Sequence, residues 1–214
     1  MKKKLFVIIT IIIFLSLCLL SGNYKIIKQL CKNIEETDNK LHDYIKILNS
    51  EIFTYDLKGQ LLKHEKKHFE IYWNGNEWIE NNRNNDTEEK CLHPFNIKDI
   101  HCFEYSIKSK GEDMLINVIL KEKFKSENAE IGEYVISKKT KHIKKENLTL
   151  NKMPSKFIKS FKIVTKYKKF KNGLNLPYEM KNIICSKEIY GIGRKVIIIT
   201  KYSYRKKPKK ITKK

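Results

Sequence analysis

The sequence contains none of the short motifs that mark common enzyme classes. It has no Gly-x-Ser-x-Gly turn, no His-Glu-x-x-His pair, no glycine-rich phosphate loop and no paired aspartate motif. No local signature of nucleophilic catalysis surrounds any cysteine. The segment 191–193, Gly-Ile-Gly, lacks the third glycine and the following helix of a dinucleotide site, so we interpret it as a hairpin turn. These absences favour a non-enzymatic binding module.

The chain has one long apolar run, and no second run follows it. Residues 1–4 carry three lysines, and Leu5–Leu20 then contains no charge. A charged start followed by an apolar core is the layout of a secretory signal, although a full membrane span needs roughly 20 residues. A cleaved signal, a retained anchor and a lipid-modified Cys18 are all compatible with residues 1–22. Each places the remainder outside the cytoplasm, in a periplasm or cell envelope.

Basic residues outnumber acidic ones, and the formal net charge is +21. Such a surface suits anionic lipid or nucleic acid, and export excludes nucleic acid as the expected partner. Residues 205–214 contain seven basic residues and Pro208, so we expect a disordered basic tail that contacts an anionic membrane surface. Between leader and tail, residues 23–204 suffice for a single domain with a hydrophobic core.

The segment from Ile26 to Leu48 has the spacing of an amphipathic helix, and no proline or glycine interrupts it. The opposite side is charged. We therefore predict one helix that covers a sheet. The apolar positions are Ile27, Leu30, Ile34, Leu41, Tyr44, Ile45 and Leu48.

From Glu51 onward the hydrophobic period changes toward two, which is typical of strands. Asn74-Gly75 and the segment Gly173–Pro177 mark tight turns. Roughly nine or ten short antiparallel strands are expected, in a barrel or a strongly curved sheet. The predicted segments include 60–65, 68–73 and 114–124, and 194–204 closes the sheet. The predicted fold class is α+β.

The expected helix is too small for the expected sheet. A sheet with an apolar face needs cover on that face, and one helix cannot cover about ten strands. Either the sheet curls around the helix, or an apolar hollow remains for a ligand.

Short motifs occur in a fixed order along most of residues 24–205. They are Asp43-Tyr44, Tyr55–Gln60, His64-Glu65, His93–Phe95, Gly132–Thr140, Pro154–Phe157, Tyr167–Pro177, Tyr190-Gly191 and Thr200–Tyr204. With the leader and the helix, this order resembles the bacterial lipoprotein carriers and outer-membrane lipoprotein-sorting proteins, in particular the divergent sorting-protein-like sequences of that superfamily.

The resemblance implies an open half-barrel of antiparallel strands with the N-terminal helix packed on its concave face. It also implies that the concave face shelters acyl chains of lipids or lipoproteins, without catalytic residues or a cofactor. Some relatives act as envelope sensors, so a membrane-tethered sensor or structural protein without a transported lipid is the alternative. Alternation within the strands selects the candidate ligand residues Ile116, Val118, Phe161, Ile163, Val196 and Ile198.

Cysteine spacing predicts a disulfide. Cys91 and Cys102 flank a short loop, and outside the cytoplasm they are a natural pair. Closing such a loop is worth roughly 2–3 kcal/mol in the chain-entropy model. Cys31 and Cys185 form a second conceivable pair, which spacing cannot test.

The same loop offers the donors of a zinc site. Cys91 and His93 at one end, with His101 and Cys102 at the other, supply two sulfurs and two nitrogens. The usual spacing between the ligands of each pair is missing. We therefore expect solvated histidines and no metal.

We predict that deleting residues 205–214 weakens binding to anionic vesicles, because each cation near such a surface contributes about 1 kcal/mol. The loss should be largest at low salt and shrink as salt screens the charges. Vesicle cosedimentation over a salt series measures it. Equal binding of the truncated and full-length chains at low salt would contradict a role for the tail.

Overall fold

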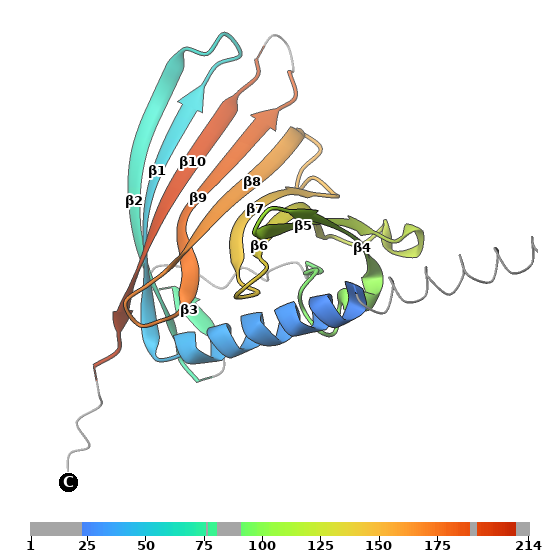
Figure 1. The fold of residues 1–214 in the computed structure, drawn as a ribbon. Coiled ribbons are helices and arrows are strands. Elements are labelled where there is room, and N and C mark those ends of the chain that lie inside the picture. The colour runs from blue at the N-terminus through green and yellow to red at the C-terminus, as the bar shows by residue number, and fades with distance from the viewer. Residues whose placement is uncertain (1–22, 76, 81–90, 189–191, 209–214) are drawn as a thin grey trace, which may run out of the picture.

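The computed structural model describes residues 23–75, 77–80, 91–188 and 192–208 (Figure 1). The predicted leader, residues 1–22, and residues 209–214 of the predicted tail lie outside this part. Within it, a helix over residues 23–41 precedes one large antiparallel sheet, so the α+β class is confirmed. No helix of the described residues is long and apolar enough to cross a membrane.

Ten described strands form the sheet in the order β3-β2-β1-β10-β9-β8-β7-β6-β5-β4, and all neighbours are antiparallel. The sheet is curved and open, with β3 and β4 at its two edges (Figure 1). Two short 3₁₀ helices, η1 (Ile100–Cys102) and η2 (Glu122–Phe124), flank β4 and β5. The strands are β1 (Tyr44–Tyr55), β2 (Leu61–Trp73), β3 (Trp78–Glu80), β4 (Phe103–Lys110), β5 (Asp113–Leu120), β6 (Glu130–Ser137), β7 (Ile143–Leu150), β8 (Ile158–Lys169), β9 (Asn175–Ser186) and β10 (Lys195–Lys206).

The helix ends at residue 41, so the predicted end at Leu48 is wrong. After a turn at residues 42–43, β1 begins at Tyr44, and Ile45 pairs with Arg205 on one side and Tyr72 on the other. The apolar positions 44, 45 and 48 fit either a helix or a strand. The strand forms because β1 lies inside the sheet, where its backbone groups have hydrogen-bond partners in β2 on one side and in β10 on the other.

Two predicted strand boundaries also change. Residues 60–65 and 68–73 were expected as separate strands, but β2 runs unbroken through both. The predicted strand 114–124 ends at Leu120, where η2 follows. The polar pair Lys66-Lys67 resembles a turn but lies inside β2. Phe124 continues the apolar pattern of β5 but lies in η2.

The predicted disordered tail does not begin at Arg205, because β10 continues to Lys206. The Arg205 guanidinium contacts the carboxylate of Glu70 in β2 at 3.2 Å. The backbone N–H of Lys207 donates to the carbonyl of Asp43 at 2.9 Å. A truncation that begins at residue 209 therefore removes tail charge without cutting the strand.

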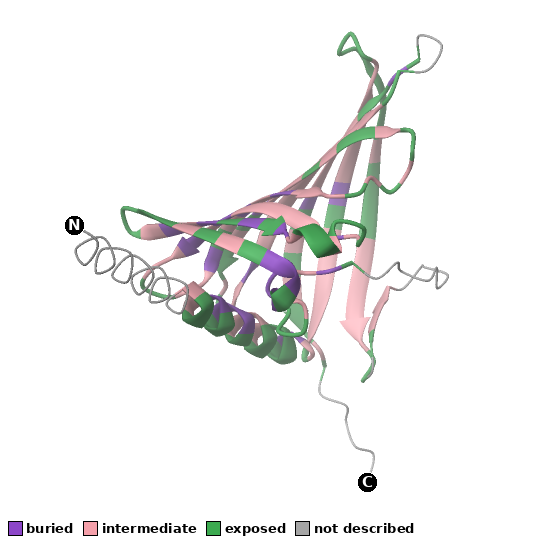
Figure 2. Cartoon of the chain, turned by 90° about the vertical axis from the view of Figure 1, so that its right-hand side faces the viewer, coloured by how far each residue is buried: buried purple, intermediate pink, exposed green. Residues whose placement is uncertain are grey.

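The hydrophobic core lies between the helix and strands β4 to β7. Ile27 and Leu30 of the helix are fully buried in one cluster with Ile116, Val118 and Tyr134. Full burial of an Ile or Leu side chain contributes about 1.5–3 kcal/mol. In β9 and β10, by contrast, most residues are only half-buried (Figure 2). The helix thus covers one half of the sheet face and leaves the other half open.

Gly132 gives a test of how closely β6 and β7 approach. Its φ is +142°, and a Cβ there would lie 2.2 Å from the carbonyl oxygen of Asn147. We predict that Gly132→Ala lowers the free energy of unfolding by about 3 kcal/mol, since backbone strain and a backbone clash act together. Gly111→Ala, at φ +55° with open space around it, should cost about 1 kcal/mol. Urea denaturation compares the two, and equal losses would contradict the close approach.

Candidate ligand cavity

A cavity of about 590 Å³ lies between the helix and the open half of the sheet. The second half of the helix forms one wall, and β1, β7, β8, β9 and β10 form the other, with loop residues 93–98 at one end. Small-molecule sites typically measure roughly 300–1,000 Å³. The aliphatic and phenylalanine side chains of the lining are Ile34, Leu41, Phe95, Ile97, Ile143, Leu176 and Pro177.

Two tyrosines of β10 extend the apolar wall. Tyr202 and Tyr204 are two residues apart, so they project from the same face of the strand and both line the cavity. The Tyr202 hydroxyl donates to Met180 Sδ at 3.5 Å, and the Tyr204 hydroxyl donates to the Pro177 carbonyl at 3.0 Å. Burial raises the pKa of Tyr202 to about 12. Because both hydroxyls are engaged by the protein, the rings rather than the hydroxyls are free to contact a ligand.

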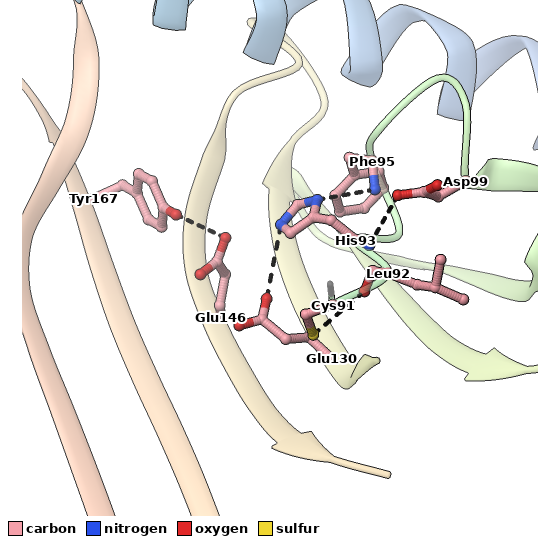
Figure 3. A network of polar contacts seen from close by, with 8 residues as sticks. All are labelled: Cys91, Leu92, His93, Phe95, Asp99, Glu130, Glu146 and Tyr167. Atoms are coloured by element: carbon pink, nitrogen blue, oxygen red, sulfur yellow. Dashed lines mark hydrogen bonds and ion pairs between the residues drawn. The ribbon is translucent and has the colours of Figure 1, made fainter. Parts of the chain in front are cut away.

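A buried carboxyl group marks the boundary between the core and the cavity. Glu146 of β7 is only 7% exposed, and it accepts a 2.7 Å hydrogen bond from the Tyr167 hydroxyl of β8 (Figure 3). Burial raises the pKa of Glu146 to about 7, although the Tyr167 hydrogen bond opposes that rise. Burial is also the main cause that raises the pKa of Tyr167, and the charge of Glu146 is the second cause. The pair therefore joins a neutral hydroxyl group to a carboxyl group, and the carboxyl group changes charge near neutral pH.

His93 lies at the loop end of the same wall (Figure 3). The Phe95 N–H donates to His93 Nδ1 at 3.3 Å, so the ring proton of the neutral imidazole sits on Nε2, 3.8 Å from Glu130 Oε2. Burial lowers the pKa of His93. Its side chain keeps 41% of its surface exposed because it borders the cavity. His93 thus presents a neutral ring.

Charged groups of both signs border the cavity in equal number, so the lining favours neither an anion nor a cation. One of the partly buried cations is Lys46 of β1, whose Nζ lies 3.4 Å from the centroid of the Trp78 ring. Burial lowers the pKa of Lys46. The charged residues of the lining are Lys46, Lys98, Lys141, Glu35, Asp38 and Glu146.

The predicted ligand residues share one face of the sheet. Cross-strand pairing aligns Val118, Ile163 and Ile198 in a single row from β5 to β10. Phe161 and Val196 belong to the next row, because each pairs with Ile184. Residues directly opposite each other project from the same face. The alternation in the sequence therefore identified the face correctly.

None of the six predicted residues lines the cavity, however. Ile116 and Val118 are completely buried beneath the helix and belong to the core, so they are not available to a ligand. Phe161, Ile163, Val196 and Ile198 are half-buried further along the same face. Sequence alternation shows which side of a strand faces inward, but it does not show which strands a helix covers.

The predicted Cys91–Cys102 disulfide is wrong in this structure, where both residues are free thiols. Cys102 is 4% exposed within the core cluster, whereas Cys91 is exposed at the start of the loop. Cys31 and Cys185 are also free. Among the described residues, no three His, Cys, Asp or Glu side chains are grouped where they could hold a metal ion.

Comparisons of the chain with protein-family models, with curated proteins and with solved structures found no match. The resemblance to lipoprotein-sorting proteins therefore rests on the order of motifs in the sequence alone.

We predict that Glu146 makes the protein less stable as the pH rises from about 4.5 to about 7. The folded state holds the proton of this carboxyl group more tightly than the unfolded state, so unfolding releases a proton in that window and the contribution is lost above it. The effect is about 3 kcal/mol. Glu146→Gln should remove this part of the pH dependence in urea denaturation, whereas the exposed Glu104→Gln should retain it. A Glu146→Gln profile parallel to wild type would contradict the assignment.

Proposed function

We propose that this chain is an extracytoplasmic, non-enzymatic protein that binds the acyl chain of a lipid or lipoprotein. In this proposal the open sheet is a half-barrel with the helix on its concave side, as in the lipoprotein-sorting proteins that the sequence resembles. The observation that carries the proposal is the cavity of about 590 Å³ between helix and sheet, with largely apolar walls. The proposed export rests on the charged start and the apolar run of residues 1–22.

An apolar strip continues the cavity along the uncovered part of the sheet. Beyond Tyr202 the same face of β10 carries Ile198 and Val196, and Ile52 of β1 pairs with Ile198. These residues are half-buried, so a chain lying on them would remove further apolar surface from water. Each sheltered CH₂ contributes about 0.8 kcal/mol. Cavity and strip together suit a long, narrow apolar ligand better than a compact one.

The charges of the lining support an amphipathic ligand whose apolar part dominates recognition. Three lysines and three acidic groups border the cavity, so the attraction for either sign of headgroup is small. The hydroxyls of Tyr202 and Tyr204 are occupied by protein acceptors. Affinity in this proposal comes mainly from burial of the chain, and the headgroup remains near solvent.

We predict that filling the cavity from the helix side reduces acyl-chain binding. Ile34 lines the cavity from the helix, so Ile34→Trp should lower the affinity for a pyrene-labelled fatty acid by about tenfold, or about 1.4 kcal/mol. Fluorescence titration measures the affinity. The matched control is Ile119→Trp, which adds the same volume to a β5 side chain that is 47% exposed and does not line the cavity.

Urea denaturation of both variants establishes that they remain folded during the titration. Reduced binding by Ile34→Trp alone supports the cavity as the acyl site. Equal affinity of wild type and both variants would reject the cavity. Absence of binding in all three folded proteins would favour the alternative, a tethered sensor or structural protein without a transported lipid.

A further inference from the structure

Exposed apolar side chains gather at one end of the sheet, remote from the cavity. Eight large hydrophobic residues of the described part are exposed, and five of them lie in or directly after three connections: β1–β2, β7–β8 and β9–β10. Scattered single residues of this kind are normal on a protein surface, but a cluster of them is not. We name these five residues the apolar tip: Leu57 (52% exposed), Leu61 (49%), Leu62 (46%), Phe157 (53%) and Ile192 (61%).

Contacts between the three connections hold the tip together. The Leu57 side chain lies so close to Gly193 that a Cβ on that glycine would meet it at 2.6 Å. The Lys187 N–H donates to the Phe157 carbonyl at 2.7 Å, which ties the end of β9 to the β7–β8 connection. In Figure 1 the β1–β2 connection, the end of β9 and the start of β10 lie at the top, at the end of the long strands opposite the helix. In Figure 2 the tips of the strands are exposed. The three connections that carry these side chains, or precede them, therefore lie side by side at this end of the sheet.

Positive charge surrounds the apolar tip. Residues 56–65, 152–160 and 187–195 contain eight basic residues and three acidic ones. One of the acidic residues, Glu65, is already paired with Lys63 at 3.0 Å. Six of these basic residues are exposed and lie within a few residues of the tip in the sequence: Lys58, Lys63, Lys156, Lys187, Arg194 and Lys195.

The tip is apolar on both sides of the sheet. Leu61 and Leu62 are neighbours in β2, so they project from opposite faces, and both are about half exposed. A protein partner docked on one face would cover only one of them. A lipid bilayer surrounds an inserted tip on all sides, and basic residues around it match anionic headgroups. We propose that the apolar tip inserts into the interface of an anionic lipid bilayer.

This contact is separate from the one expected of the basic tail. In β10, Lys195 at the tip and Lys206 at the tail lie at opposite ends of a strand that pairs with β1 along its whole length. At about 3.3 Å per residue, the two ends are up to about 36 Å apart along the strand. Charges separated by more than the Debye length of roughly 10 Å act independently at 0.1 M salt. The tip and the tail therefore make distinct membrane contacts, whichever ligand occupies the cavity.

The test reads the environment of the tip itself in the full-length chain, so membrane binding through residues 1–22 does not obscure it. Leu62→Cys is labelled with the fluorophore NBD, in a background where Cys18, Cys91 and Cys185 are replaced by Ser. The protein is added to vesicles of phosphatidylglycerol and phosphatidylcholine whose acyl chains carry a nitroxide quencher. The matched control is Glu104→Cys with the same label, on an exposed residue of the remote strand β4.

The expected result is quenching of the label at position 62 by at least about twofold, with little quenching at position 104, because only the tip enters the bilayer interface. Raising the salt concentration or omitting phosphatidylglycerol should reduce the quenching. Replacing Leu57 and Leu61 by Ser in the labelled protein should abolish it. These side chains are exposed, so unchanged denaturation midpoints would show that the fold is kept.

Two results would overturn the proposal. A label at position 62 that stays unquenched with anionic vesicles would assign the tip to a partner other than a bilayer. Quenching that persists unchanged after Leu57→Ser and Leu61→Ser would show that the apolar side chains do not drive the contact.

Discussion

The described part of the structure depends on one geometrical constraint, which is that its one α-helix must cover a ten-stranded antiparallel sheet. Ile27 and Leu30 belong to one cluster with residues of β5 and β6, and there the side chains are fully buried. Over β8, β9, β10 and β1 no second layer of the described residues provides equivalent cover. Apolar side chains in this half are consequently half-buried, and the space beside the helix becomes a cavity. The filled core and the proposed binding site both follow from the fact that the helix covers only part of the sheet.

The polar pair Glu146–Tyr167 lies where the filled half meets the open half. A carboxyl group buried to this extent costs stability when it ionises, and the Tyr167 hydroxyl compensates for only part of that cost. Apolar residues at these two positions would extend the core without this cost. The pair instead gives one wall of the cavity a group that changes charge near neutral pH. Ligand occupancy and proton binding at Glu146 are therefore expected to influence each other.

Much of the fold could be predicted from the sequence, because strands and turns leave local signals. Alternation placed Val118, Ile163 and Ile198 on a common face, and the register confirms this. The end of the helix was mispredicted because positions 44, 45 and 48 satisfy a helical and a strand pattern equally, and only pairing with β2 and β10 decides between them. The six predicted ligand residues lie outside the cavity lining for a similar reason. Which strands the helix covers is a tertiary property with no local signal.

Some residues of the cavity leave a recognisable pattern in the sequence, and others do not. The alternation of Tyr202 and Tyr204 in the closing strand is visible in the sequence, and it could have placed both on the same face as Val196 and Ile198. Glu146 carried no comparable signal, since it is one of several charged residues in a mixed strand and only its burial distinguishes it. The free thiols of Cys91 and Cys102 also depended on tertiary packing, which separates a buried residue from an exposed one.

The central claim is that the open half of the sheet shelters an acyl chain. Native mass spectrometry of the full-length protein, released from its own membranes in mild detergent, tests it most directly. The account predicts a bound species whose mass and fragments identify a lipid or an acylated peptide, released only when the protein unfolds. A homogeneous, unliganded mass from folded protein under the same conditions would contradict it.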